Sequence, residues 1–414
     1  MKRLFNRVRG LSRRASAAGA VTAQFSQALA SFFVTVVALR GLDASTFGQL
    51  SLLLGGLIVA TAVMTGLVGD SLTVLDRHNR EVRAGLQVVC LGVTTAVLLL
   101  GAAVSHAADL LNTQQALVYG LAVCAFVVED TIRRLLMANL AFWRVVVVDL
   151  SYLVVAVIWL ALHSAFEGPL SLGAVIAAVL VGQCVAIAVG VRLLPREERR
   201  LVRQSSPDVR SVLAFGTWRA LQQTLRPLSL TMVRVAVASA LGAAALGGLE
   251  AARIYTSPLL LLVQGMGGFL LVSYARQRSA PLAQALRKAD GAAAGLVAAS
   301  VLLGAAAVVL LPALGGGLTG GEGLSRASIA AWSAYAAAVA ATMPYASLAA
   351  VRGRQAVVLG LRAVDTALGV SLAVVGLHLG ASGSFAPAAL AVGSLVGAVL
   401  QREVARGRAR GPAD

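Results

Sequence analysis

The chain has 414 residues, of which 58% are hydrophobic and only 13% charged, and its formal net charge is +17. This apolar fraction lies well above the roughly half-apolar usage of soluble domains, so lipid rather than one aqueous core surrounds most side chains. Basic nucleic-acid-binding proteins gather arginine on a soluble face, whereas here the arginines flank apolar segments. Composition therefore predicts a multi-pass membrane protein that contacts lipid and excludes nucleic acid as a partner.

Apolar segments long enough to cross a hydrocarbon core of about 30 Å recur along the chain. In chain order we predict twelve spans, at residues 16–39, 49–69, 84–104, 116–137, 145–163, 171–193, 211–238, 248–272, 290–311, 327–349, 357–379 and 386–402. The connections between them are short, which leaves no room for a large catalytic domain outside the membrane. The four histidines show no ligand spacing to one another or to cysteine, so no metal site and no catalytic residue is predicted.

Positive charge alternates from one connection to the next. Of the 35 Lys and Arg residues, 29 lie at the two termini or in every second connection. Cationic loops resist translocation, so this alternation places both termini in the cytoplasm. The predicted location is the inner membrane of a bacterium.

The longest inner connection, 194–210, has the composition of a linker, with Pro195 and the run Ser205-Ser206-Pro207. It divides the chain into a basic N-terminal segment (1–15), a six-helix bundle (16–193), the linker itself, a second six-helix bundle (211–402) and a tail (403–414). The stretch 241–249 of the second bundle echoes the stretch 42–50 of the first. We therefore predict an all-α fold of two pseudo-symmetric bundles around a central cavity, related by an axis along the membrane normal.

Three segments carry a resemblance to a known family. The segment Ala38-Leu39-Arg40-Gly41-Leu42-Asp43-Ala44-Ser45-Thr46-Phe47-Gly48-Gln49-Leu50 resembles the first outer loop of bacterial polysaccharide flippases. These are the O-antigen (Wzx-type) branch of the multidrug/oligosaccharidyl-lipid/polysaccharide (MOP) exporter superfamily. The runs Asp130-Thr131-Ile132-Arg133-Arg134-Leu135-Leu136-Met137-Ala138 and Leu249-Glu250-Ala251-Ala252-Arg253-Ile254-Tyr255-Thr256-Ser257-Pro258-Leu259 are also similar. The resemblance implies alternating access and a lipid-diphosphate-linked glycan as cargo, with a polysaccharide polymerase or glycosyltransferases as further partners.

Three arginines inside the seventh predicted span are the candidate substrate-binding residues. At about 100° per residue, Arg219 and Arg226 lie about 20° apart and Arg234 a further 80°, so all three can share one broad face. A central arginine costs roughly 2.5 to 3.5 kcal/mol in a membrane helix, so this face is expected to meet water, acids or ligand. The planar fork of arginine suits the oxygens of a diphosphate. Pro227 is expected to kink the helix beside Arg226.

A structural role for these arginines is the alternative, in which they pair with Glu129, Asp130 and Asp149 near the fourth and fifth spans. Glu250 and Arg253, three residues apart, are expected to form a local pair. Asp149 and Asp365 occupy equivalent positions in the two halves. They are candidates for a coupling ion or, as the plainer reading, solvated or arginine-paired carboxylates.

The first span carries a polar stripe that includes Gln24, Gln27 and Ser31, and the seventh carries Gln223. Such residues are expected to face the bundle interior rather than lipid. They would line a sugar path by hydrogen bonding, or serve as polar packing between helices.

The sequence thus predicts a non-enzymatic flippase that moves a polyprenyl-diphosphate-linked oligosaccharide to the outer leaflet. It needs no cofactor, while coupling to H⁺, Na⁺ or the membrane potential stays open. The first alternative is a cation-coupled multidrug antiporter of the same superfamily, which would need acidic rather than basic groups in its cavity. A membrane enzyme that uses lipid-linked glycans is the second.

Overall fold

A computed structural model describes residues 22–23, 26–199, 202, 206–276, 281–318, 324–352 and 355–406. Within these residues the chain is helical, without strands. The helices are Ser26–Gly41, α2 (Ala44–Met64), η1 (Thr65–Gly69), α3 (Asp70–Val74), α4 (Arg80–Ala107), α5 (Thr113–Ala138), α6 (Phe142–Phe166), α7 (Leu172–Leu193), α8 (Val209–Leu241), α9 (Ala243–Arg276), α10 (Leu282–Leu318), α11 (Arg326–Val351), α12 (Gln355–His378) and α13 (Phe385–Arg406).

Because α2, η1 and α3 follow one another without a break, the described residues form twelve helical stretches, one for each predicted span. Eight of these stretches are long and apolar enough to cross a membrane. The polytopic, all-α fold class is therefore confirmed.

Several predicted boundaries are wrong. The predicted spans 211–238 and 248–272 leave a nine-residue outer connection, but α8 and α9 are separated by Gly242 alone. Gly242 adopts φ +86°, a backbone conformation that glycine reaches without steric penalty, so one residue reverses the chain. The alanines and leucines on either side favour helix over loop. Helix α10 likewise continues past Pro312 to Leu318, although proline and the three glycines at 315–317 are poor helix formers.

The chain forms two compact units whose boundary falls inside a helix. The described residues of the first unit fall within 1–42 and 53–227, and those of the second unit fall within 43–52 and 228–414. Helix α8 therefore divides at Pro227, its first half belonging to the first unit and its second half to the second. The start of α2 belongs to the second unit and its remainder to the first.

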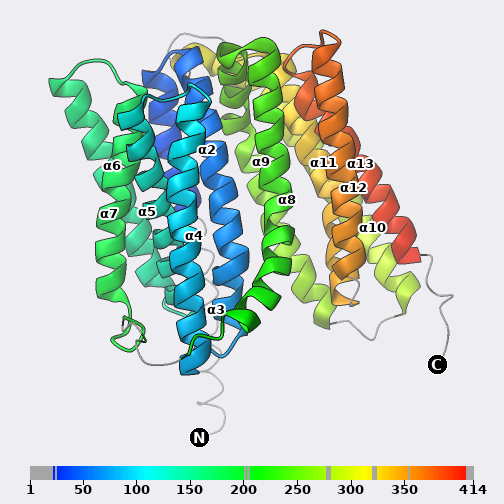
Figure 1. Cartoon of the computed structure of the whole chain (residues 1–414). Coiled ribbons are helices and arrows are strands. Elements are labelled where there is room, and N and C mark those ends of the chain that lie inside the picture. Colours follow the sequence, from blue (N-terminus) through cyan, green and yellow to red (C-terminus); the bar gives the residue numbers. More distant parts are fainter. Residues whose placement is uncertain are drawn as a thin grey trace, which may run out of the picture. The chain divides into compact units, whose positions relative to one another are not determined.

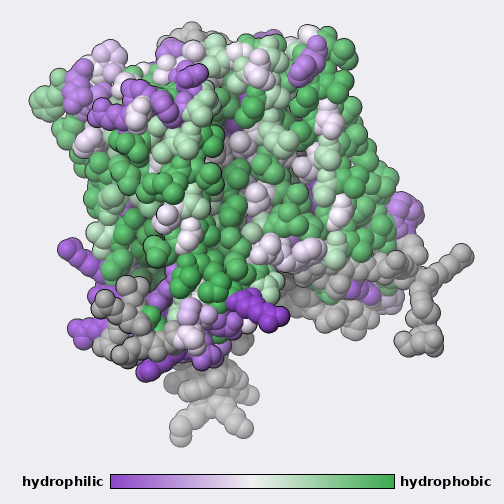
Figure 2. Space-filling view, viewed as in Figure 1, coloured by the Kyte–Doolittle hydropathy of each residue, from purple (hydrophilic) through white to green (hydrophobic). Residues whose placement is uncertain are grey.

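In the first unit, α5 packs against α4 and α7, and α7 packs against α6 (Figure 1). Large apolar side chains such as Leu91, Leu99 and Val154 are exposed along the middle of α4 and α6. Figure 2 shows hydrophobic residues over the middle of this unit and hydrophilic residues gathered at its two ends. This distribution is expected of helices whose outer faces meet lipid.

In the second unit, α11 is the central helix and packs against α9, α10 and α13, while α12 packs on α13. The buried residues of α11 and α13 are mostly alanine, glycine and serine, which let the helix backbones approach closely. Trp332 of α11 is buried and donates a hydrogen bond from Nε1 to the carbonyl oxygen of Leu249 on α9, 3.0 Å away.

The first turns of α2 and α9 cross at two glycines. A Cβ built on Gly48 would lie 1.9 Å from the carbonyl oxygen of Ala243, and one on Gly247 would lie 2.0 Å from that of Ala44. In the sequence echo between residues 42–50 and 241–249, Gly48 corresponds to Gly247 and Ala44 to Ala243. The echo therefore marks a reciprocal helix crossing within the second unit.

Asp43 caps the N-terminus of α2. Its carboxylate accepts hydrogen bonds from Thr46 Oγ1 at 2.6 Å and from the backbone N–H groups of Thr46 and Ser45 at 3.0 and 2.9 Å. These bonds favour the charged form and hold the pKa of Asp43 below its usual value. Asp43 is exposed, so it stabilises the protein mainly by ordering the backbone at the start of α2.

We expect Asp43→Ala to lower the stability of the protein by about 1 kcal/mol near neutral pH, the usual loss for an N-cap. Because the pKa is lower in the folded state, the stabilisation is complete above the unfolded value of about 3.9 and disappears as pH falls through the folded value. The thermal midpoints of the wild type and the variant should therefore converge under acid. A difference that stayed constant down to about pH 3 would contradict the charged cap.

Candidate functional site

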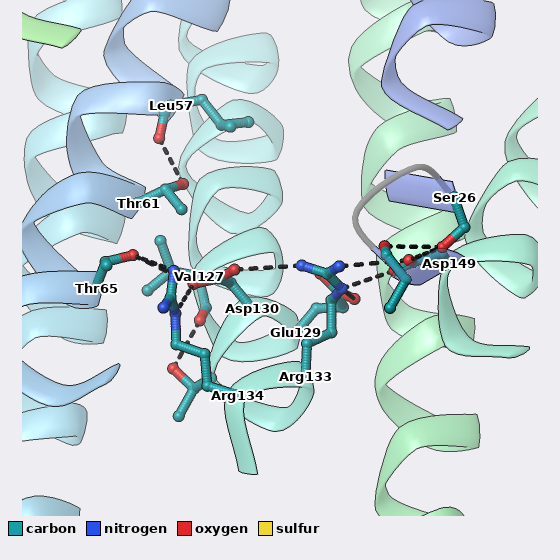
Figure 3. A network of polar contacts seen from close by, with 12 residues as sticks. Ser26, Leu57, Thr61, Thr65, Val127, Glu129, Asp130, Arg133, Arg134 and Asp149 are labelled. Atoms are coloured by element: carbon teal, nitrogen blue, oxygen red, sulfur yellow. Dashed lines mark hydrogen bonds and ion pairs between the residues drawn. The ribbon is translucent and has the colours of Figure 1, made fainter. Parts of the chain in front are cut away.

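The first unit encloses a network of charged side chains at the C-terminal half of α5 (Figure 3). Arg133 donates from Nε to Asp149 Oδ1 of α6 at 2.7 Å and from Nη2 to Asp149 Oδ2 at 3.3 Å. Ser26, from the first described helix, donates its hydroxyl to the same carboxylate. Glu129 and Asp130 each lie 3.6 Å from a guanidinium nitrogen of Arg133. One arginine thus joins three carboxylates.

Arg134 extends the network to η1. It donates from Nε to Asp130 Oδ2 at 2.7 Å and from Nη2 to Thr65 Oγ1 at 2.8 Å (Figure 3). Thr65 belongs to η1, a π-helical turn, and such turns are frequent at functional sites. Gly69 of this turn contacts the Arg134 side chain, and a Cβ there would lie 2.4 Å from Cδ.

The network holds three carboxylates and two guanidiniums. Arg133 is 1% exposed, and Glu129, Asp130 and Asp149 are all buried. Buried charges are tolerated only when paired and hydrogen-bonded. The surplus carboxylate gives this site the chemistry to hold one cation or one proton.

Arg219 lies in the half of α8 that belongs to the first unit. Its Nη2 lies 2.7 Å from Asp70 Oδ2, and its Nη1 donates to Gln222 Oε1 at 2.8 Å. Gln223 also donates to Asp70 Oδ2, at 3.2 Å. Asp70 directly follows η1, so the π-helical turn positions groups for both arginine systems of this unit.

The π-helical turn also packs tightly on α8. A Cβ on Gly66 would lie 2.1 Å from Cα of Ala220, and one on Gly216 would lie 2.6 Å from the carbonyl oxygen of Leu67. The lack of side chains lets the two backbones touch. This contact fixes the position of Arg219 relative to Asp70.

In the second unit, Arg234, Glu250 and Arg253 form a triad. Arg234 donates from Nε to Glu250 Oε1 at 3.1 Å and from Nη2 to Oε2 at 3.2 Å. Arg253 donates from Nε to Glu250 Oε2 at 2.6 Å. The predicted pairing of Glu250 with Arg253 is confirmed, and Arg234 joins it through α8.

Asp365 is buried between α12 and α13. A Cβ on Gly397 of α13 would lie 2.2 Å from Asp365 Oδ2. Among the described residues Oδ2 accepts no hydrogen bond, and the nearest guanidinium nitrogen, Nη1 of Arg362, is 3.8 Å away. Asp365 and Asp149 therefore differ, because only Asp149 receives a bidentate arginine.

Two of the three predicted arginines have different carboxylate partners. Arg219 pairs with Asp70 in the first unit and Arg234 with Glu250 in the second, so their partners are not the expected acids Glu129, Asp130 and Asp149. Arg226, beside Pro227, is half-buried and takes part in an interaction of its own.

The structure describes only part of the polar stripe of the first span. Gln24 lies outside the described residues, Gln27 is half-buried and Ser31 is exposed. Thr35 donates to the carbonyl oxygen of Ser31 at 2.6 Å. Gln223 is placed in the Asp70 system rather than in this stripe.

Two features of the site are not predicted from the sequence. Arg133 and Arg134 are not among the candidate site residues predicted from the sequence, but both lie within α5 and Arg133 is fully buried. The spacing of Glu129 and Asp130, three to five residues before these arginines, is the signal that indicates a paired helix face. No local pattern links Asp70 to Arg219, 149 residues later.

Neither a protein-family model nor a curated protein sequence matches the chain. Several solved transporter structures are similar to it. An inward-facing multidrug resistance MATE family transporter of the MOP superfamily has a TM-score of 0.72 at 14% identity, over 92% of this chain and 94% of that one. A eukaryotic MATE transporter has a TM-score of 0.59 at 16% identity, over 97% and 99%.

A MOP superfamily transporter from Pyrococcus furiosus has a TM-score of 0.55 at 13% identity, over 95% of this chain and 92% of that one. At these identities the likeness concerns the fold alone. The chain therefore has the fold of MATE-type transporters over nearly its full length, and it is a multi-pass membrane protein.

Proposed function

We propose that this chain is an exporter that moves a polyprenyl-diphosphate-linked oligosaccharide from the inner to the outer leaflet of a bacterial cytoplasmic membrane. The transporter fold and the resemblance of residues 38–50, 130–138 and 249–259 to polysaccharide flippases support the proposal. The chain acts without covalent chemistry, by binding its cargo and changing conformation.

The composition of α8 carries the proposal. This helix contains Arg210, Arg219, Arg226 and Arg234 and no acidic residue among its 33 residues. Asp70 and Glu250, from neighbouring helices, compensate two of these charges. A membrane helix with an excess of arginine suits an anionic cargo, because the guanidinium fork matches phosphate oxygens.

The division of α8 at Pro227 supports a mechanical role for the same helix. Each half is tied to its own unit by an arginine–carboxylate pair, and proline removes a helical hydrogen bond at the division. Arg226 lies directly before this point. A change in the bend of α8 would therefore move Arg226, which links cargo binding to alternating access.

The driving force does not require a nucleotide. With a cytoplasm-negative potential, outward movement of each negative charge gains about 2.3 kcal/mol per 100 mV. The surplus carboxylate near Arg133 offers a place for H⁺ or Na⁺ coupling, and a polysaccharide polymerase or glycosyltransferases would be the partners of such a cargo.

Multidrug export is the second candidate, because a similar structure belongs to a multidrug resistance MATE transporter. The surplus carboxylate of the first unit favours it, since a cationic drug needs acidic groups. The fold itself is compatible with pockets of different polarity, because the Pyrococcus furiosus transporter is described as having a binding pocket of reverse polarity. The charge of the cargo therefore separates the two candidates.

The test is native mass spectrometry of the protein purified in mild detergent, on the wild type and Arg226→Gln. We expect a polyprenyl-diphosphate glycan to co-purify with the wild type and its occupancy to fall about tenfold or more in the variant, the usual effect of losing a charge-assisted hydrogen bond. Arg210→Gln, an exposed arginine at the start of the same helix, is the matched control and should retain the lipid.

Bulk phospholipid alone in the wild type, together with drug-cation transport in proteoliposomes, would replace the proposal with the multidrug candidate. Equal glycolipid occupancy in the wild type and Arg226→Gln would remove Arg226 from the cargo site.

A further inference from the structure

We infer that Arg253 is an anion-binding residue of the second unit, with a phosphate group as its ligand. The inference rests on the proposed function and deepens it, since it assigns the diphosphate a contact outside α8. It starts from the Arg234–Glu250–Arg253 triad, in which two guanidiniums share one carboxylate.

The two arginines of the triad are held in different ways. Arg234 engages both oxygens of Glu250 through Nε and Nη2, which is a bidentate structural pair. Arg253 reaches Glu250 through Nε alone, at 2.6 Å. Glu250 therefore engages Arg253 through one guanidinium nitrogen, whereas it engages Arg234 through two. A guanidinium held in this way keeps further N–H donors, and arginine can grip a phosphate by two parallel hydrogen bonds.

The side chains of the two arginines also differ in their exposure. The side chain of Arg253 is 23% exposed, whereas that of Arg234 is 4% exposed and that of Glu250 is 2% exposed. A ligand can reach Arg253 without disturbing the buried pair behind it.

Arg253 lies on the side of α9 away from the exposed apolar residues of that helix. Leu262, nine residues later and 60% exposed, lies about 180° around the helix from Arg253 at about 100° per residue. Met266, another exposed apolar residue, lies about 140° away. Arg253 thus lies on the face of α9 opposite these exposed apolar side chains.

The charge of the triad favours a counter-ion. Two guanidiniums and one carboxylate leave one positive charge within the membrane helices, and an arginine there is unfavourable unless it meets an anion or water. A phosphate oxyanion at Nη1 and Nη2 supplies that compensation. The triad is thus the reverse of the Arg133 network, which has a surplus of carboxylate.

The test measures ligand binding to the full-length protein by native mass spectrometry, with undecaprenyl diphosphate, undecaprenyl monophosphate, phosphatidylglycerol and inorganic pyrophosphate as separate probes. We expect Arg253→Gln to weaken undecaprenyl diphosphate binding by about tenfold to a hundredfold. Arg253→Lys should recover only part of the affinity, since lysine is a point charge without the fork. Arg326→Gln, which removes an exposed arginine at the start of α11, is the charge-matched control.

The probes distinguish the source of the phosphate. Loss of inorganic pyrophosphate binding in Arg253→Gln would support a site for the anion itself, and loss confined to the lipids would support a headgroup site. Thermal midpoints near that of the wild type would show that the variants fold, as expected because Glu250 keeps Arg234.

Equal binding of undecaprenyl diphosphate by the wild type and Arg253→Gln would overturn the inference and leave the proposed function standing. Equal losses in Arg253→Gln and Arg326→Gln would also overturn it, because general surface charge would then explain the effect. A wild type that binds none of the four probes would overturn the inference and the proposed function together.

Discussion

Replacing Gly48 by alanine is expected to prevent stable folding of the second unit, whereas the same replacement at Gly248 is expected to be harmless. A Cβ on Gly48 would lie 1.9 Å from the carbonyl oxygen of Ala243, so the backbones of α2 and α9 would have to separate. Overpacking in a core costs up to about 3 kcal/mol when side chains can move, and a clash with backbone costs more. A Cβ on Gly248 would have no atom within 4 Å, so alanine there adds only helix propensity.

The measurement is the thermal midpoint of purified protein in detergent, followed by fluorescence-detected size exclusion. Gly247→Ala should be as damaging as Gly48→Ala, because its Cβ would lie 2.0 Å from the carbonyl oxygen of Ala44. Midpoints of Gly48→Ala and Gly247→Ala within a few degrees of that of Gly248→Ala would show that the close crossing is not required.

The second large effect is expected at Arg133. Arg133→Met removes the guanidinium that joins Glu129, Asp130 and Asp149, and it leaves buried carboxylates without their main partner. Breaking a buried ion pair in this way costs about 3 to 5 kcal/mol. We expect the variant to express poorly and to lose its cooperative thermal transition.

A double variant separates charge from shape. Arg133→Met with Asp149→Leu removes both partners of the bidentate pair, and we expect it to recover part of the lost stability, because an apolar pair of similar volume can replace an ionic one. Arg134→Gln is the control, since the Arg134 side chain is 24% exposed and its loss should be smaller. If Arg133→Met were no less stable than Arg134→Gln, the network would not support the fold of the first unit.

The sequence predicts the helices of this protein well because their signals are local. The length of the apolar segments and the arginines at every second connection are sufficient to predict the twelve helical stretches. The tight turn at Gly242 is not predicted, since a glycine-rich stretch is typical both of a loop and of a close helix crossing. Only the packing of Gly247 on Ala44 distinguishes these alternatives.

The candidate site is harder to predict because its pairs join distant parts of the chain. Local spacing predicts Glu250 with Arg253, three residues apart, and this pair is present. The partner of Arg219 depends on a π-helical turn that brings Asp70 onto α8, and no sequence pattern indicates such a turn. The spacing of the acids and arginines in α5 can be read from the sequence. The burial of Arg133 follows from the packing of the helices alone.

The division of α2 and α8 between the two units constrains the order of folding during synthesis. Residues 209–227 complete the first unit, so the first six helical stretches emerge from the ribosome without a segment that they require. Residues 43–52 are made early, but their partner turn at Ala243 is made about two hundred residues later. Completion of the first unit therefore has to wait until α8 has entered the membrane, and the segment 43–52 has to wait for α9 before it meets its partner in the second unit.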